Sequence, residues 1–319
     1  MDIKYHGKNR EKDLLTHRTV LVDGIRMNIA EQGEGPLVVL LHGWPETSHS
    51  WRHQMAPLAD AGYHVVAPDQ RGYGRTDRPA GVGQYTLLHL VGDVVGLIHA
   101  LGEQEAIVVG HDWGAPVAWH TALLRPDLVR GVAGLSVPPG LRLPLPPLSL
   151  LRERFGEGFY QIYFQQPGVA EAELGADLHT TFRKLLGGAA GAPVVRDGEG
   201  FLGCFTTPNQ LPDWLDDEDV DAAVESFGQS GFTGGLNWYR NIDRNWELLA
   251  AWHDRPITPP ALYLCGDGDM TRSFSDTSRI AQAATDLRDV VDIPGAGHWV
   301  QMERPDEVNA ALLDFFKQL

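Results

Sequence analysis

Residues 106–119 read AIVVGHDWGAPVAW, a short β-branched run that passes through a glycine-flanked turn into an apolar helical pattern. The run predicts a buried strand, and the residues after the turn predict a helix. Asp112 stands in the turn between glycines at 110 and 114, where a nucleophile elbow holds its reacting side chain. The glycines suit the strained backbone of such an elbow. A helix N-cap is the alternative interpretation of Asp112, because aspartate is favoured there.

The chain on both sides of this stretch alternates strands and helices. An Asp-Gly dipeptide at 23–24 predicts a tight hairpin turn between two short strands. Further strand patterns lie at 37–41, 64–67, 261–265 and 290–293, and helical patterns at 85–101, 116–124 and 306–319. This alternation predicts a doubly wound α/β domain with a mostly parallel sheet.

The alternation stops at Ser136. Five prolines between 138 and 147 can neither continue a helix nor lie in a central strand, and a connection is favoured over a polyproline ligand. Residues from about 150 to 247 then show helical patterns rich in aromatic residues, interrupted by a glycine-rich stretch at 187–200. We therefore expect an α/β core split by an inserted helical cap. The expected segments are core 1–137, cap 138–247 and core 248–319.

Composition limits the classes of function. The 319 residues carry 26 basic and 42 acidic side chains, a net charge of −16 with neutral histidines, which opposes binding to nucleic acid. Cys204 and Cys265 are too few for a disulfide framework or a cysteine-rich zinc site. Residues 1–15 are polar and no run of 18 apolar residues follows, so we expect no membrane segment and a cytoplasmic protein.

Two later loops carry the partners that an aspartate at the elbow needs. Asp267 and Asp269 follow one late strand pattern, and His298 follows the last one. Ligands bind at the carboxyl edge of such a sheet, where these loops meet. Nucleophile, acid and histidine also stand in the chain order of α/β-hydrolases. We therefore predict a triad of Asp112, His298 and one of the two late aspartates.

The loop at 42–46 predicts half of an oxyanion hole. A loop at that place supplies one main-chain N–H, and the residue after the nucleophile supplies the other. The expected donors are the N–H groups of Trp44 and Trp113. An aspartate nucleophile disfavours an esterase, because a carboxylate attacks an sp³ carbon with a leaving group more effectively than an ester.

Motifs along nearly the whole chain, from about residue 20, resemble the soluble epoxide hydrolases of the α/β-hydrolase superfamily. They are HGWPE (42–46), SWRHQ (50–54), DQRGYG (69–74), GHDWGAPVAW (110–119), YFQQPGVAEAEL (163–174), GFTGGLNWYRN (231–241) and GAGHWVQMERP (295–305). The nucleophile region is shared with haloalkane dehalogenases, whereas the cap motifs are more specific. The resemblance implies an α/β-hydrolase fold with a helical cap, conversion of epoxides to vicinal diols, and no metal or organic cofactor.

The resemblance also implies two ring-opening tyrosines. They correspond to Tyr160, four residues before Phe164, and to Tyr239 in NWYR; Tyr163 is the alternative to Tyr160. The chemistry supports this role independently. Opening an epoxide creates an alkoxide whose conjugate acid is weaker than a phenol, so a phenol can donate a hydrogen bond early and a proton late.

The triad acid implied by the family pattern is Asp269 rather than Asp267. In the implied mechanism Asp112 forms an ester with the opened epoxide, and His298 activates the water that hydrolyses it. Neutral His298 is required, so activity should fall on acidification. The aromatic cap predicts an apolar substrate.

Other interpretations stay open at this point. A haloalkane dehalogenase would use the same ester chemistry, and a catalytically silent α/β-hydrolase would act as a small-molecule receptor. For His111 we expect a structural hydrogen-bonding role, not a metal site, and for the acidic run 213–219 a helix start. We expect a monomer or a homodimer.

Overall fold

The computed structural model describes residues 14–188, 193–275 and 277–319, so most of the polar opening stretch and part of the glycine-rich stretch lie outside them. These residues contain an eight-stranded sheet in the order β1-β2-β4-β3-β5-β6-β7-β8. Strand β2 is antiparallel to β1 and β4, and the remaining neighbours are parallel. The strands are β1 (Thr16–Val22), β2 (Ile25–Gln32), β3 (Leu37–Leu41), β4 (His64–Pro68), β5 (Ala106–His111), β6 (Val129–Leu135), β7 (Ala261–Gly266) and β8 (Leu287–Ile293).

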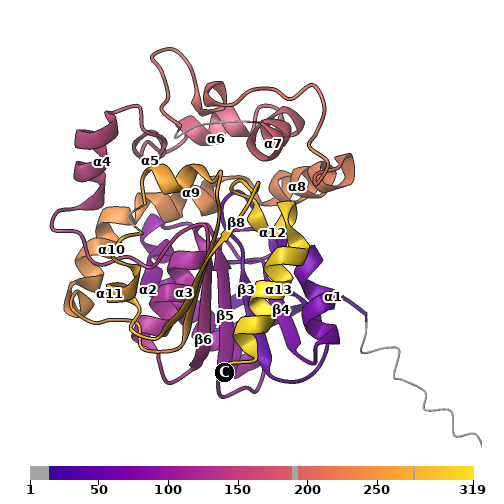
Figure 1. Cartoon of the computed structure of the whole chain (residues 1–319). Coiled ribbons are helices and arrows are strands. Elements are labelled where there is room, and N and C mark those ends of the chain that lie inside the picture. Colours follow the sequence, from indigo (N-terminus) through magenta and orange to yellow (C-terminus); the bar gives the residue numbers. More distant parts are fainter. Residues whose placement is uncertain (1–13, 189–192, 276) are drawn as a thin grey trace, which may run out of the picture.

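Helices cover both faces of this sheet (Figure 1). Alternate residues of β3 belong to two separate apolar cores, Leu37 and Val39 to one and Val38 and Leu40 to the other, so the strand is apolar throughout. The first face packs against α2 (Leu87–Ala100) and α3 (Gly114–Leu124), and the second against α1 (Arg52–Asp60) and α13 (Pro305–Phe316). The predicted hairpin is confirmed, with positive φ at Asp23 and Gly24.

The segment between β6 and β7 is helical, and Figure 1 shows α4 to α8 as a layer over one end of the sheet, with α9 beneath them. It contains α4 (Pro147–Phe155), α5 (Tyr160–Tyr163), α6 (Val169–Leu174), α7 (Leu178–Gly187), α8 (Asp217–Ser230), α9 (Thr233–Arg240), α10 (Ile242–Leu248) and the 3₁₀ turns η3 (Phe201–Cys204) and η4 (Leu249–Trp252). The other short elements are η1 (Ser48–Trp51), η2 (Val82–Tyr85), η5 (Met270–Ser273), α11 (Ile280–Ala283) and α12 (Val300–Glu303). The domain boundaries at 138 and 247 stay a prediction.

The proline-rich run is a connection that lies on α10. The Arg142 guanidinium stacks 3.7 Å from the centre of the Trp246 ring, and the Trp246 indole N–H donates to the Leu143 carbonyl at 2.8 Å. The acidic run ends in α8, where Asp216 caps the helix by accepting from the N–H of Asp219. The expected helix start is therefore confirmed.

Two core elements have no counterpart in the sequence analysis, β6 and α1. Gly131 and Gly134 weaken the strand pattern of β6, yet a Cβ at Gly134 would collide with the Trp119 indole of α3. Glycine is required there because the helix packs directly on the strand. Helix α1 contains Pro57, which weakens a helical pattern.

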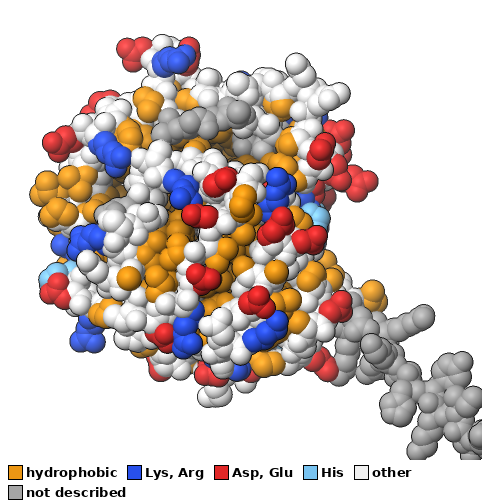
Figure 2. All heavy atoms as spheres, viewed as in Figure 1, with side chains coloured by type: hydrophobic (Ala, Val, Ile, Leu, Met, Phe, Trp, Pro, Cys, Tyr) orange, Lys and Arg blue, Asp and Glu red, His pale blue; other side chains and the backbone are white. Residues whose placement is uncertain are grey.

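Strand β8 forms one edge of the sheet, and its burial pattern is mostly exposed. On the face drawn in Figure 2, apolar side chains gather near the middle and charged side chains surround them. Val290 of β8 is one of the exposed apolar residues, with acidic Asp289 beside it in the strand. Charged neighbours of this kind protect an edge strand from pairing with other chains.

None of the helices in the described ranges has the length and hydropathy needed to cross a bilayer.

Candidate active site

The elbow between β5 and α3 holds Asp112 in a left-handed backbone conformation, with φ of 47°. A Cβ at Gly114 would collide with the Leu41 carbonyl, and one at Gly43 would collide with Asp112 itself. The turn is therefore pressed against the neighbouring β3 loop. Helix α3 has Trp113 at its N-cap and no side-chain capping hydrogen bond. The N-cap interpretation of Asp112 is wrong, because its carboxylate points to that loop instead.

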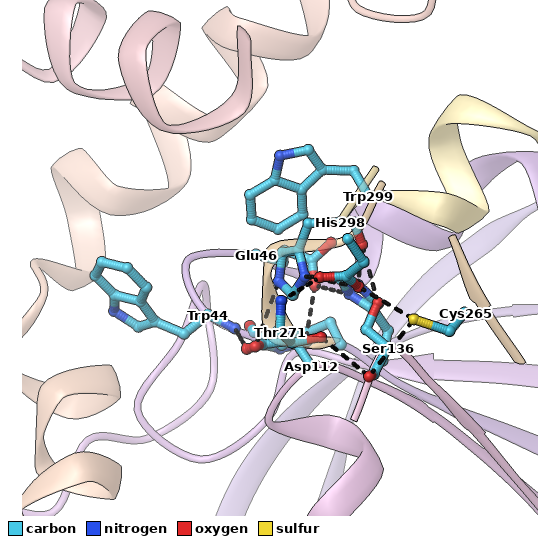
Figure 3. Close-up of polar contacts among 12 residues, drawn as sticks. Trp44, Glu46, Asp112, Ser136, Cys265, Thr271, His298 and Trp299 are labelled. Atoms are coloured by element: carbon cyan, nitrogen blue, oxygen red, sulfur yellow. Dashed lines mark hydrogen bonds and ion pairs between the residues drawn. The ribbon is translucent and has the colours of Figure 1, made fainter. Parts of the chain in front are cut away.

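The Asp112 carboxylate lies between a main-chain donor and an imidazole (Figure 3). Its Oδ1 accepts from the Trp44 N–H at 2.8 Å, and its Oδ2 lies 3.4 Å from His298 Nε2. Burial acts to raise the pKa of Asp112, but the hydrogen bond and charge of His298 outweigh it and the pKa is lowered. The carboxylate is thus ionised and ready to act as a nucleophile at neutral pH. The Trp113 N–H makes no hydrogen bond to this carboxylate within the described structure.

Asp269 binds the other side of the imidazole. The Nδ1 of His298 lies 3.1 and 3.2 Å from its two carboxylate oxygens. Burial opposes ionisation of Asp269, but the charge and hydrogen bond of His298, together with the hydrogen bond from the Thr271 N–H, hold its pKa far below the usual range. Burial would likewise lower the pKa of His298, yet Asp269 and Asp112 together raise it well above its ordinary value.

Asp267 lies apart from this arrangement. Its side chain is exposed, and its Oδ1 accepts from the Gly295 N–H at 2.9 Å in the neighbouring loop. The structure therefore brings Asp269, and not Asp267, to His298.

The main chain of His298 is fixed on both sides. Glu303 accepts from the N–H of Gly297 at 2.7 Å and from that of Trp299 at 2.9 Å. The His298 carbonyl accepts from His111 Nε2 at 2.7 Å and from the Ser136 hydroxyl at 3.1 Å. Because all these partners act on the backbone, the imidazole itself is left for Asp112 and Asp269.

His111 connects this backbone to a buried carboxylate. Its Nδ1 lies 2.8 Å from Glu46 Oε2, which also accepts from the Gly43 N–H at 2.7 Å. Gln301 donates to the other oxygen of Glu46 at 2.9 Å. Glu46 thus joins the Trp44 loop, the elbow and α12. His111 has a hydrogen-bonding role, as expected, and the described residues include no group of three His, Cys, Asp or Glu side chains placed to hold a metal ion.

Tyr160 and Tyr239 enter the same site from two different helices, α5 and α9. Both are buried, and their ring centres lie 5.9 Å apart. Gln161 Nε2 donates to the Tyr160 hydroxyl at 2.9 Å, and the Trp113 ring lies edge-on to the Tyr239 ring, with the ring centres 5.1 Å apart. Burial and the charge of Asp112 raise the pKa of both tyrosines, so each phenol keeps its proton.

Tyr163 is placed differently. Its hydroxyl donates to Glu173 Oε2 at 2.8 Å. Glu173 also accepts from the N–H groups of Phe201 and Leu202 at the start of η3. Tyr163 and Glu173 therefore support the turn that presents Phe201, while Tyr160 faces the reacting groups.

A cavity of about 390 Å³ joins all these groups. Asp112, His298, Tyr160 and Tyr239 line it together, and most of the other lining residues are apolar. The sheet domain contributes Trp44, Met270 and Trp299 to the cavity wall, and the helical segment between β6 and β7 contributes Phe201 and Trp214.

Sequence reasoning missed residues that act on the main chain or on other site residues, notably Glu46, Ser136 and Glu303. Glu46 and Glu303 stand inside recognisable motifs, but nothing in the pattern shows which N–H groups they accept from. Cavity-lining Gly268 and Thr271 were missed as well.

The fold and the order of the site residues along it define an α/β-hydrolase. Residues 36–189 match the family model described as the alpha/beta hydrolase fold. The predicted fold class is thereby confirmed.

Relatives match the chain over almost its full length. Epoxide hydrolase A of Mycobacterium tuberculosis is 46% identical over 315 residues, which cover 95% of this chain and 98% of the relative. Epoxide hydrolase 3 of Siraitia grosvenorii is 40% identical, covering 96% and 99%. The crystal structure of epoxide hydrolase A from Mycobacterium thermoresistibile has a TM-score of 0.93 at 47% identity, covering 95% and 98%. The chain therefore belongs to the epoxide hydrolase family, as the motifs indicated.

Proposed function

We propose that the protein converts apolar epoxides to vicinal diols through an ester on Asp112. The observation that carries this proposal is the single cavity in which a carboxylate nucleophile, an imidazole base and two protonated phenols meet. Its apolar walls suit the body of an apolar epoxide. The names of the relatives agree with this reaction.

In the first step a carboxylate oxygen of Asp112 attacks a ring carbon, and the bond from that carbon to the ring oxygen breaks. The ring oxygen takes a proton from one of the two tyrosines, while the other donates a hydrogen bond. This transfer is favourable because the alkoxide is more basic than a phenolate. The products are an ester on Asp112 and one phenolate.

Ester formation changes the charge around His298. Asp112 loses its negative charge, so one of the two charges that raise the pKa of His298 disappears. His298 then gives its proton to the phenolate and becomes neutral. Asp269 keeps the ring oriented through its contact with Nδ1.

In the second step neutral His298 takes a proton from water, whose oxygen attacks the ester carbonyl carbon of Asp112. The N–H groups of Trp44 and Trp113 stabilise the resulting oxyanion. When the tetrahedral intermediate collapses, the diol oxygen leaves with the proton held by His298. The carboxylic acid on Asp112 returns its own proton to His298, which restores the starting charges.

Two other functions fit the site less well. A haloalkane would form the same ester, but its halide leaves as a stable anion and needs no phenol, so the paired tyrosines favour an epoxide. A silent receptor would not require an imidazole held between two carboxylates.

Mass spectrometry of the His298→Gln variant tests the proposal. Without its base the ester should persist, so styrene oxide is expected to add its whole mass to the peptide that contains Asp112. An adduct from a bromoalkane alone, with loss of bromide, would assign the protein to the dehalogenases. The absence of any adduct on folded protein would contradict the covalent mechanism.

A further inference from the structure

The two tyrosines are held by different parts of the molecule. Helix α9, which carries Tyr239, is docked on the core: Gly234 packs against the backbone of Gly72, and the Trp238 indole donates to the Arg71 carbonyl at 3.2 Å. Helix α5, which begins with Tyr160, is a single turn of four residues. A helix this short has little stability of its own. The position of Tyr160 relative to Tyr239 therefore depends on what joins α5 to α9.

One side chain joins them directly. The Nε2 group of Gln165 donates to the Gln161 carbonyl at 2.7 Å and to the Tyr239 carbonyl at 2.9 Å. Both hydrogens of one amide group are thus used, one on each tyrosine-bearing helix. The first acceptor belongs to the residue next to Tyr160, and the second belongs to Tyr239 itself.

The same contact orients the phenol of Tyr160. Gln161, whose backbone is held by Gln165, donates from its own side chain to the Tyr160 hydroxyl at 2.9 Å. The phenol oxygen accepts this bond, so its proton is free to point to the epoxide oxygen. A shift of the Gln161 backbone would move both the ring and the donor that orients its hydroxyl.

We propose that Gln165 is a positioning residue for epoxide opening, which sets the spacing at which Tyr160 and Tyr239 reach one ring oxygen. This role rests on the proposed function. Gln165 touches no reacting atom and acts through the two tyrosines.

The cap has further links that should preserve its fold without Gln165. The Arg240 Nε donates to the Phe164 carbonyl at 3.1 Å, and Arg240 forms a largely buried ion pair with Glu171 at 2.8 Å. Tyr160 N–H also donates to the Pro193 carbonyl at 3.1 Å. Loss of Gln165 should therefore loosen the spacing of the tyrosines without unfolding the cap.

Single-turnover kinetics with styrene oxide separate this role from a general structural one. Gln165→Met keeps the length of the side chain and removes both donors, and it is expected to slow ester formation about tenfold. Hydrolysis of the ester, which uses His298 but neither phenol, should stay within about twofold. Gln165→Glu places a carboxylate, which only accepts hydrogen bonds, against two carbonyl oxygens. It should therefore slow ester formation more than Gln165→Met does. Gln166→Met, at the exposed neighbouring position, is the matched control and should leave both steps unchanged.

A double-mutant cycle with Tyr239→Phe gives the second readout. If Gln165 acts by aligning two phenols, Gln165→Met should slow ester formation only slightly in the Tyr239→Phe background, where one phenol is absent. An undiminished loss in the Tyr239→Phe background, equal slowing of both steps, or an unaffected Gln165→Met variant would each overturn the positioning role alone. Failure of the wild-type protein to form any ester would overturn the proposed function and this role with it.

Discussion

Glu303 holds His298 without touching its ring. The carboxylate accepts from the two N–H groups that flank the histidine, at 2.7 and 2.9 Å, and so fixes the loop that ends β8. Each carboxylate oxygen accepts from one of these N–H groups, so a glutamine at this position would place its amide NH2, a donor, against one of them, and the remaining hydrogen bond would lose its charge assistance.

We expect Glu303→Gln to slow hydrolysis of the ester about tenfold while ester formation changes by less than about twofold. Rapid-quench measurement of both steps checks this. Glu307→Gln, at an exposed position in the first turn of α13, is the control. Equal slowing of both steps would contradict the role of Glu303 in placing the base.

The two late aspartates should behave differently. Asp269→Asn removes the charge that orients and stabilises the His298 imidazolium, so we expect hydrolysis of the ester to fall by a factor of about 100 or more. Asp267→Asn alters only an exposed loop contact and should leave turnover within about twofold. Steady-state turnover and accumulation of the ester are the measurements. A severe loss in Asp267→Asn would transfer the acid role to that residue.

The two chemical steps should depend differently on pH. The lowered pKa of Asp112 keeps the nucleophile ionised, and the raised pKa values of both tyrosines keep the acids protonated, so ester formation should be flat between about pH 5 and 9. Hydrolysis needs neutral His298 and should fall on acidification through the histidine pKa of the ester form. That pKa lies below the raised value in the free enzyme, because Asp112 is then uncharged. A flat profile for hydrolysis over this range would exclude His298 as the base.

Removal of one phenol should affect ring opening alone. Tyr160→Phe and Tyr239→Phe are each expected to slow ester formation by about 100-fold and to leave hydrolysis of a preformed ester nearly unchanged. Tyr163→Phe removes a hydroxyl that contacts Glu173 and should change ester formation by less than about threefold. Stopped-flow kinetics on the three variants would show the difference. A larger effect at Tyr163 than at Tyr160 would reverse the assignment.

Gly134 of β6 provides a test of the core. Gly134→Ala pushes a methyl group into the Trp119 ring and should lower the free energy of unfolding by about 1–3 kcal/mol. Gly92→Ala, in α2 where a Cβ meets no atom within 4 Å, should raise it by about 0.5–1 kcal/mol. Urea denaturation measures both. An unchanged free energy of unfolding in Gly134→Ala would show that α3 and β6 can move apart without loss of stability.

The sequence patterns indicated the residues proposed to react better than the residues that position them. Asp112, His298 and the late aspartates were found because each follows an apolar run, and parallel strands bring their carboxyl ends together. Glu303 and Gln165 were missed because their role is to accept from or donate to main chain, and that depends on where a loop folds back. No spacing in the sequence encodes such a contact.

Element prediction failed for a related reason. In β6, Gly131 and Gly134 lower the strand signal, although close packing of the Trp119 ring of α3 is what requires glycine at 134. Pro57 has the same effect on α1. At Gly134 a tertiary contact determines the residue, and local preference misleads.

The link between Gln165 and Tyr239 also closes a loop in the chain. The segment between residues 166 and 232 leaves the site at Gln165 and returns to it in α9, so its two ends are tied together beside the reacting groups. This segment supplies the outer cavity wall, including Phe201 and Trp214, but none of the residues proposed to react. It is thus a natural unit for exchange between relatives. Grafting the corresponding segment of a relative between these fixed ends would change which substrates fit the cavity, while the residues proposed to react stay in place.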